Sequence, residues 1–251
     1  MMKIYETHAH LDFSKYDKDR EKMFKDSFTA GVEYINNIGV DEKSIIASFK
    51  LAEKYPQIYA TAGFHPHDAE AYDAELVRKY ASHPKCVAIG EIGLDYYRNL
   101  SPKKIQKQVF IDQIKIAMEF DLPIVVHDRD AHEDTLEILE EYMPKKVVFH
   151  CFAGDELMAQ KIVAHGWKIS FTGTITYKNS NQHNVVRLCP NDAFFIETDS
   201  PYLTPVPFRG KRNDPSKLRY VIEQIADLKR MPPKKIAEYA YSNSVKFFLN
   251  K

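Results

Sequence analysis

Residues 4–10, Ile4-Tyr5-Glu6-Thr7-His8-Ala9-His10, form an apolar run that ends in two histidines one residue apart. Because a β-strand points alternate side chains the same way, the pattern predicts that His8 and His10 face one point in space. Imidazole is the commonest metal ligand among side chains, so this strand end predicts part of a metal site. Two structural histidines joined by hydrogen bonds are the alternative that these residues alone leave open.

Short apolar runs of this kind recur and alternate with longer amphipathic stretches. The expected strands are Ile4–His10, Val32–Ile38, Ile58–Phe64, Cys86–Ile92, Pro123–His127, Lys146–His150, Trp167–Gly173 and Ala193–Glu197. The expected helices are Asp17–Ala30, Glu42–Lys54, Asp73–Ala81, Lys103–Phe120, Glu133–Tyr142, Asp155–His165, Asn179–Cys189 (the weakest pattern), Pro215–Leu228 and Lys234–Leu249. Eightfold alternation within 251 residues predicts an α/β protein, a single-domain TIM-type (β/α)8 barrel over 1–251, regular or distorted.

Composition narrows the class of protein further. Thirty-five basic and 35 acidic residues give a net charge of zero, so any polyanion must be held by local charge rather than by a global field. No apolar run is long enough for a signal peptide or a membrane span, which predicts a cytoplasmic protein with no membrane partner. The three cysteines are widely spaced, which argues against a disulfide framework and against a thiolate metal cage.

Chemically capable side chains stand where the predicted strands end, which is where a TIM-type barrel gathers its active site. Six of them form a nitrogen and oxygen donor set without sulfur: His8, His10, Glu91, His127, His150 and Asp199. Such a set is large enough for two divalent ions that share a carboxylate. Two-metal hydrolases use this arrangement to stabilise the attacking and leaving oxygens of a phosphoryl displacement, or to generate hydroxide at neutral pH.

Seven motifs between residues 7 and 213 resemble those of the TatD family of metal-dependent hydrolases, a deoxyribonuclease-like branch of the amidohydrolase barrels. They are Thr7-His8-Ala9-His10-Leu11-Asp12, Gly63-Phe64-His65-Pro66-His67, Gly90-Glu91-Ile92-Gly93-Leu94-Asp95-Tyr96-Tyr97, Pro123-Ile124-Val125-Val126-His127, His150-Cys151-Phe152, Glu197-Thr198-Asp199-Ser200-Pro201-Tyr202-Leu203 and Arg209-Gly210-Lys211-Arg212-Asn213. One departure is Glu6, where the family commonly has Asp before Thr-His. We expect Glu6 to lie beside the ligands rather than among them.

The resemblance implies a site with two divalent ions. In it His8, His10 and Asp199 hold one ion, His127 and His150 hold the other, and Glu91 bridges them. Mg²⁺ is the expected metal, with Mn²⁺ and Zn²⁺ admissible on ligand type.

The expected reaction is attack of an activated water on a phosphodiester, with Asp199 taking the water's proton and Glu91 and His65 completing the catalytic set. His65 is expected near the scissile phosphate, as a hydrogen-bond donor or a proton shuttle. A turn histidine ordered by Pro66 is the alternative for His65. The implied enzyme is a deoxyribonuclease, 3′–5′ exonuclease-like on single-stranded or frayed DNA, and a monomer is favoured.

Substrate contacts are expected from loops that follow strand ends. Besides His65, the candidates are Arg98, Tyr96, Arg129, Arg209 and Arg212, the arginines for phosphates and the tyrosine for base stacking; core packing is the alternative for the aromatic side chain. Tyr97 beside Arg98 is a further stacking candidate. The remaining histidines are expected to be solvated: His67, His83, His132, His165 and His183.

Two other functions stay open from the residues alone. A hydrolase of a small amide, ester or lactone could use the same barrel and the same activated water. Carbonyl hydrolases of this superfamily usually bridge their metals with a carboxylated lysine on strand four, whereas strand four here offers Glu91, and Lys85 lies at its other end. A non-catalytic binding module is the second alternative, and the complete donor set argues against it.

Overall fold

The computed structural model describes residues 2–249. These residues fall into two compact units. The first unit comprises the chain up to Asn36 together with the chain from Gly154 onward, and the second comprises Asn37–Ala153. Among residues 2–249, no helix combines the length and the apolar character that crossing a membrane requires.

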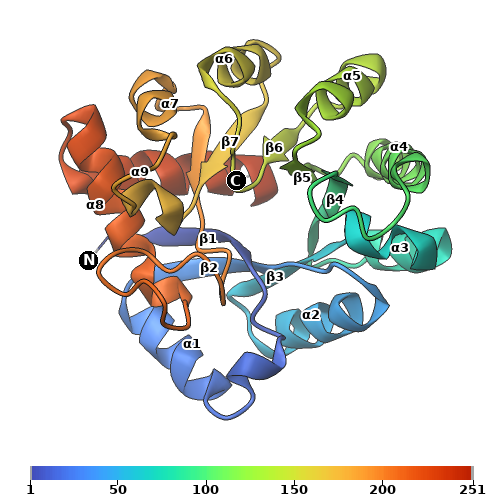
Figure 1. Ribbon diagram of the computed structural model, residues 1–251. Coiled ribbons are helices and arrows are strands. Elements are labelled where there is room, and N and C mark those ends of the chain that lie inside the picture. The colour runs from blue at the N-terminus through green and yellow to red at the C-terminus, as the bar shows by residue number, and fades with distance from the viewer. Residues whose placement is uncertain (1, 250–251) are drawn as a thin grey trace. The chain divides into compact units, whose positions relative to one another are not determined.

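The first unit is built around strands whose side chains are almost all buried. Its elements are β1 (Ile4–Ala9), α1 (Arg20–Thr29), most of β2 (Val32–Asn37), α6 (Glu156–Ala164), β7 (Lys168–Phe171), α7 (His183–Leu188), β8 (Phe194–Ile196), α8 (Leu218–Lys229) and α9 (Pro233–Ser244) (Figure 1). Strand β7 pairs with β8 in parallel, and α9 packs on both β1 and β8. The ring of Phe195 in β8 packs against those of Phe247 and Phe248, which follow α9. This packing fixes the end of β8 from which the loop to Asp199 leaves.

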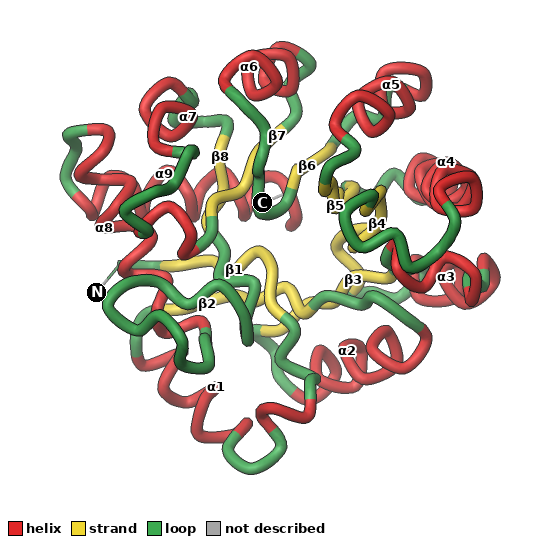
Figure 2. The backbone as a smooth tube through the Cα atoms, viewed as in Figure 1, coloured by secondary structure: helices red, strands yellow, loops and turns green. Residues whose placement is uncertain are grey.

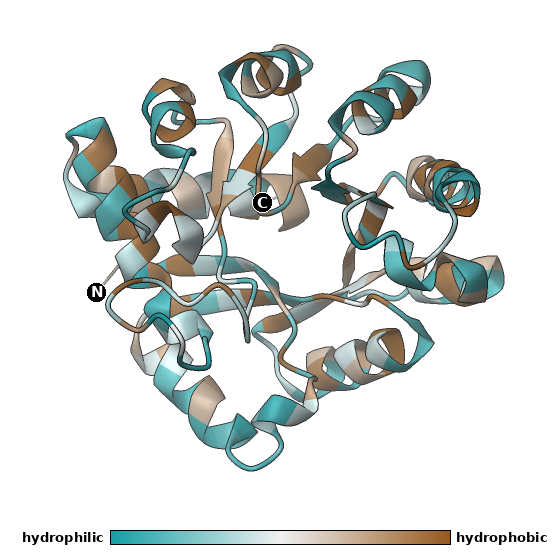
Figure 3. Cartoon of the chain, viewed as in Figure 1, coloured by the Kyte–Doolittle hydropathy of each residue, from teal (hydrophilic) through white to brown (hydrophobic). Residues whose placement is uncertain are grey.

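The second unit contains the longest strand and the longest helix of the described chain. Its elements are α2 (Glu42–Lys54), β3 (Ile58–Ala62), α3 (Ala74–Ala81), β4 (Cys86–Asp95), α4 (Lys103–Glu119), β5 (Ile124–Arg129), α5 (His132–Tyr142) and β6 (Val147–Phe149). All ten residues of β4 are buried. Helix α4 is hydrophobic on the side that carries Phe110 and Ile114 and hydrophilic on the other, as the colouring of Figure 3 shows.

The strands follow one another in the sheet in the order of the sequence, β1 to β8. Within the second unit β3, β4, β5 and β6 pair in parallel, and helices separate the strands along the chain (Figure 2). Parallel strands in sequential order with intervening helices are the TIM-type (β/α)8 fold, which confirms the fold class predicted from the sequence.

Several boundaries differ from the prediction. Strand β4 continues three residues beyond Ile92 to Asp95, because it keeps pairing with β5 up to Asp95 opposite Arg129. Gly93 permits this approach: a Cβ on Gly93 would lie 1.9 Å from the carbonyl oxygen of His127, and its φ is +145°. The expected helix Asn179–Cys189 forms only at His183–Leu188, and the expected final helix changes to a π-helical turn at Val245.

Candidate metal centre

Three predicted ligands converge in the first unit at the ends of β1 and β8. His8 Nε2 lies 3.3 Å from His10 Nε2, and Asp199 Oδ1 lies 3.4 Å from His10 Nε2 and 3.8 Å from His8 Nε2. His8 lies within β1 and His10 just beyond it, as strand alternation predicts. The backbone secures the third member, since the Asp199 amide donates to the carbonyl of His8 and the His10 amide donates to that of Ser200.

Glu6 links the ends of β1 and β8 next to this cluster. Its carboxyl group is fully buried and accepts hydrogen bonds from the His8 amide, from the Thr198 amide and from the Thr198 hydroxyl, the last at 2.6 Å. Burial raises the pKa of Glu6 to about 8, against the opposing effect of the hydrogen bonds from Thr198 and His8. Glu6 therefore positions the backbone next to the predicted ligands, which agrees with the place expected for it.

Asn213 fixes the loop that carries Asp199. Its side-chain amide donates to the carbonyls of Thr198, at 3.1 Å, and Tyr202, at 2.7 Å, and its own carbonyl accepts from the Tyr16 hydroxyl. Asn213 is completely buried. The motif from 209 to 213 thus contributes a structural asparagine, a role that the sequence pattern did not indicate.

A second cluster forms in the second unit around the carboxylate of Glu91. The Oε1 atom of Glu91 lies 2.7 Å from His127 Nδ1, 3.1 Å from His150 Nε2 and 3.6 Å from His65 Nε2. Glu91 is on β4, His127 is on β5, His150 directly follows β6 and His65 follows β3. The structure therefore brings the predicted ligands of neighbouring strands together, and His65 with them.

Asp95 holds His127 from the other side of the imidazole ring. Its Oδ2 lies 3.2 Å from His127 Nε2 and 2.8 Å from His67 Nε2, and its Oδ1 accepts from the amide of Arg98. Burial alone would raise the pKa of Asp95, but these hydrogen bonds outweigh it and hold the pKa below its usual range. Burial lowers the pKa of His127, yet its hydrogen bonds to Asp95 and Glu91 produce a net rise.

A carboxylate on the far nitrogen of a ligating histidine is the usual outer partner in metal sites, where it fixes the tautomer and the ring orientation. Asp95 stands in this relation to His127. The expectation that His67 is a solvated surface residue is wrong, because His67 bonds to Asp95. The sequence did indicate that Asp95 would lie on the side of Glu91. Glu91, Gly93 and Asp95 are spaced two residues apart, so they lie on one side of β4.

His65 is suited to donating a hydrogen bond rather than to holding an ion. The amide of His67 donates to His65 Nδ1 at 3.1 Å, so the proton of the neutral ring is on Nε2, the atom that faces Glu91. Burial and the neighbouring His127 hold the pKa of His65 well below its usual value, which keeps the ring neutral. Ligand atoms of His65, Glu91 and His127 do lie within 4.8 Å of one another, but an N–H group cannot bind a cation.

Two glutamines of α4 align the backbone segments that carry these groups. Gln113 accepts from the Phe64 amide at 2.7 Å and donates to the Phe64 carbonyl at 3.0 Å, next to His65. Gln106 accepts from the Asp95 amide at 2.9 Å and donates to the Asp95 carbonyl at 3.2 Å. Both side chains are almost completely buried, so each one satisfies the backbone of a neighbouring segment.

The donor sets fit divalent ions by their chemistry and spacing. Imidazole nitrogen and carboxylate oxygen bind divalent metals at about 2.0–2.2 Å, which places adjacent ligand atoms about 2.8–3.6 Å apart in octahedral or tetrahedral geometry. The separations of 3.3 and 3.4 Å from His10 Nε2, and that of 3.1 Å between His150 and Glu91, agree with this requirement. Each cluster could hold an ion after small adjustments.

The predicted substrate-binding residues differ in how far their side chains already interact with other residues of the chain. Tyr96 donates its hydroxyl to Asp134 at 2.6 Å, and the guanidinium of Arg212 forms two hydrogen bonds with Asp19, at 2.8 and 2.6 Å. Arg129 stacks on Tyr97 at 4.0 Å, and Arg209 stacks on Tyr177 at 4.4 Å. Arg98 is exposed at the start of the loop after β4. The ring of Tyr96 and the charge of Arg212 are thus already used within the chain.

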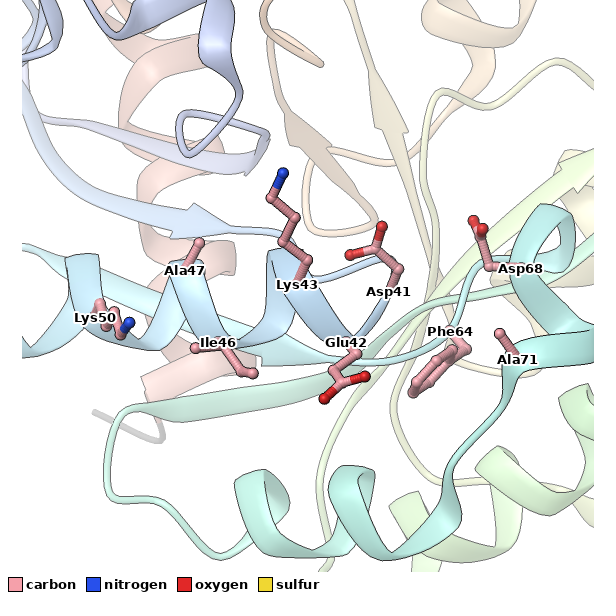
Figure 4. A pocket seen from close by; sticks show the side chains of 9 residues that line it. All are labelled: Asp41, Glu42, Lys43, Ile46, Ala47, Lys50, Phe64, Asp68 and Ala71. Carbon is pink, nitrogen blue, oxygen red and sulfur yellow. The ribbon is translucent and has the colours of Figure 1, made fainter.

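A groove of about 670 Å³ lies in the second unit between the start of α2 and residues 64–71 (Figure 4). The carboxylates of Asp41 and Asp68 point to the same side of it, and Glu42 also lines it. Burial and the charge of Asp41 raise the pKa of Asp68. Asp41 caps α2 by accepting from the Ser44 amide. Two lysines line the groove as well, so its lining carries charges of both signs.

Comparison with known proteins places this geometry in a family. The model of the family described as TatD related DNase matches residues 5–249. The chain belongs to the TatD family. This confirms the resemblance found in the motifs, and it makes the chain a metal-dependent hydrolase.

Similar TatD-family proteins include both unassigned hydrolases and a named nuclease. The chain is 43% identical over 251 residues to YabD, an uncharacterized metal-dependent hydrolase of Bacillus subtilis (strain 168), with 98% of each chain covered. It is 35% identical over 235 residues to the 3′-5′ ssDNA/RNA exonuclease TatD of Escherichia coli (strain K12), covering 89% of this chain and 90% of that one. The crystal structure of YjjV, a TatD homologue from Escherichia coli K12, superposes with a TM-score of 0.93 at 29% identity, covering 98% of both chains.

Proposed function

We propose that this TatD-family hydrolase cleaves phosphodiester bonds of DNA, as a 3′–5′ exonuclease on single-stranded or frayed ends. The observation that carries the proposal is the convergence of His127, His150 and His65 on one oxygen of Glu91. It combines two histidines whose ring nitrogens can bind a divalent ion with one N–H donor, which is the pair of functions that a phosphoryl transfer site requires. The name of the Escherichia coli relative, a 3′-5′ ssDNA/RNA exonuclease, supports the substrate class.

In the proposed site His8, His10 and Asp199 would hold one divalent ion, and His127, His150 and Glu91 would hold a second. The bound ions would supply Lewis acidity and lower the pKa of a water molecule. Asp199 accepts the proton of the attacking water. His65, neutral and protonated on Nε2, donates to a nonbridging oxygen of the scissile phosphate and stabilises the charge that develops there.

Strand β4 offers no lysine where a carbonyl hydrolase would carry its bridging group. Lys85 precedes β4 at its other end, where its Nζ donates to the carbonyls of Pro56 and Ile58. Glu91 is the side chain that β4 presents among the histidines. This arrangement favours phosphodiester over amide or lactone chemistry.

The test is digestion of 5′-end-labelled single-stranded DNA, duplex DNA and RNA, with ester and lactone substrates in parallel. Protein stripped with EDTA should be inactive and should recover with Mg²⁺, Mn²⁺ or Zn²⁺, giving a ladder that shortens from the 3′ end. His150→Ala should abolish cleavage, whereas His83→Ala, a control at a histidine that packs edge-on against Phe49, should retain it. Cleavage of carbonyl substrates alone would overturn the proposal.

A further inference from the structure

Residues 96–102 form the loop between β4 and α4 (Figure 2), and two large apolar side chains of this loop are exposed to solvent. Tyr97 is 61% exposed and Leu100 is 64% exposed. Exposed apolar groups of this size lose the free energy that burial would provide, and two of them within four residues form a local apolar patch. The patch follows directly on the strand that carries Glu91 and Asp95.

The exposure of Tyr97 is imposed by a well-anchored backbone on either side of it. Tyr96 donates its amide to the Arg129 carbonyl at 2.9 Å, and the Arg98 amide donates to Asp95 Oδ1 at 2.7 Å. Farther along, the hydroxyl of the buried Ser101 donates to the His67 carbonyl at 2.9 Å. The carbonyl of Ser101 accepts from the side-chain amide of Gln106. The loop therefore presents Tyr97 in a defined place and prevents it from collapsing onto the core.

Arg129 covers one face of the Tyr97 ring. The centre of its guanidinium lies 4.0 Å from the ring centroid, a cation–π contact within the second unit. Stacking on one face orients the ring and leaves its other face for a ligand. The guanidinium also places a positive charge, with that of Arg98, beside whatever lies on the ring.

The pair stands next to the second-unit cluster. Arg129 and His127 are two residues apart on β5, so their side chains leave the same side of the strand. Tyr97 is two residues beyond Asp95, which holds His127. A ligand on Tyr97 would therefore lie along the same strand ends as the ion site proposed at Glu91, His127 and His150.

We propose that Tyr97, backed by Arg129, is a stacking platform for one unpaired nucleobase of the substrate, and that it makes the enzyme select single strands and frayed ends. The proposal rests on the proposed function. A base presents a flat π-face to the free face of Tyr97, and its phosphate lies within reach of the charges of Arg98 and Arg129. A base within a duplex is already paired and stacked, so it cannot occupy the platform without being unpaired first.

The experiment compares Tyr97→Ala and Tyr97→Phe with the full-length wild-type enzyme loaded with Mn²⁺. The substrates are a single-stranded oligonucleotide, the same oligonucleotide with abasic sites over its 3′-terminal nucleotides, and bis(p-nitrophenyl) phosphate, which has no base. Base–aromatic stacking is worth a factor of about 5 to 150. We expect Tyr97→Ala to raise KM for the intact oligonucleotide by such a factor, and Tyr97→Phe to change it less than about twofold because the ring remains.

For the abasic oligonucleotide and for the small diester we expect Tyr97→Ala to match wild type. Tyr239→Ala, at a 37% exposed tyrosine of α9, is the control for loss of an exposed ring. An equal loss of activity on all three substrates would assign Tyr97 to folding or to the metal site, and no loss on the intact oligonucleotide would remove it from binding; either result overturns the inference. If wild type cleaves no phosphodiester, it is the proposed function that fails.

Discussion

Glu6 makes the stability of the chain depend on pH in a way that one substitution should remove. The pKa of Glu6 is raised by burial from 4.5 to about 8 in the folded protein. A raised pKa means that the folded state binds the proton more tightly than the unfolded state. The stabilisation is therefore fully present below pH 4.5 and is lost as the pH rises toward 8. Each pH unit between the two pKa values corresponds to about 1.4 kcal/mol. The free energy of unfolding therefore falls by about 3–4 kcal/mol between pH 5 and pH 8.

Glu6→Gln replaces the neutral carboxyl group with an amide of nearly the same shape that cannot ionise. Its carbonyl oxygen can still accept from the amides of His8 and Thr198, the two partners of Glu6 Oε1. We expect the free energy of unfolding of the variant to lack the pH dependence that Glu6 contributes. The free energy of unfolding of Glu6→Gln minus that of wild type should be about 3–4 kcal/mol larger at pH 8 than at pH 5.

The assay is urea unfolding of both proteins at intervals from pH 5 to pH 8, followed by circular dichroism in the presence of EDTA. The histidines titrate in both proteins, so their contributions cancel in the difference between the two curves. A difference that stays constant across this range would refute the reasoning. It would mean that the hydrogen bonds from Thr198 and His8 keep Glu6 ionised in spite of its burial.

Three further results are expected. Asp95→Asn should weaken Mn²⁺ binding about 10- to 100-fold in calorimetric titration, because His127 loses the carboxylate that orients it; an unchanged Kd would contradict this. His65→Ala should lower kcat about 100- to 1000-fold while leaving Mn²⁺ affinity within about twofold, and an equal loss of affinity would make His65 a ligand. Gly93→Ala should unfold at lower temperature than Gly166→Ala, because a Cβ at 93 meets a carbonyl oxygen at 1.9 Å and one at 166 meets nothing within 4 Å. Similar thermal unfolding midpoints for the two variants would show that β4 and β5 can move apart at Gly93 without loss of stability.

The fold could be predicted from the sequence because each strand is a short apolar run with a polar or chemically capable residue at its end. Burial of both faces of a parallel strand makes such runs nearly continuous, as β4 shows. The end of β4 was predicted too early because Leu94 and Asp95 look like the start of a loop. Their pairing with β5 depends on the close approach at Gly93, which no local pattern expresses.

Part of the candidate site could be predicted from the sequence. Strand period and residue type indicated His8, His10, Glu91, His127 and His150, since a ligand must leave the strand on one side and near its end. The contacts that the predicted substrate-binding side chains make within the chain could not be derived in this way. The ion pair of Arg212 with Asp19 joins residues far apart in the chain, and a sequence pattern does not show that the charge expected to bind phosphate is already paired.

Asp95 connects two functions through one carboxylate. Its Oδ2 faces His127 and its Oδ1 holds the backbone of the loop that displays Tyr97. If the strand of a nucleic acid shifts this loop, the shift alters the support of a metal ligand, and the two binding equilibria become coupled. Thermodynamic reciprocity then requires that the factor by which an oligonucleotide changes metal affinity equals the factor by which the metal changes oligonucleotide affinity. In the proposed site, Asp95 would therefore make metal binding respond to whether a strand is bound.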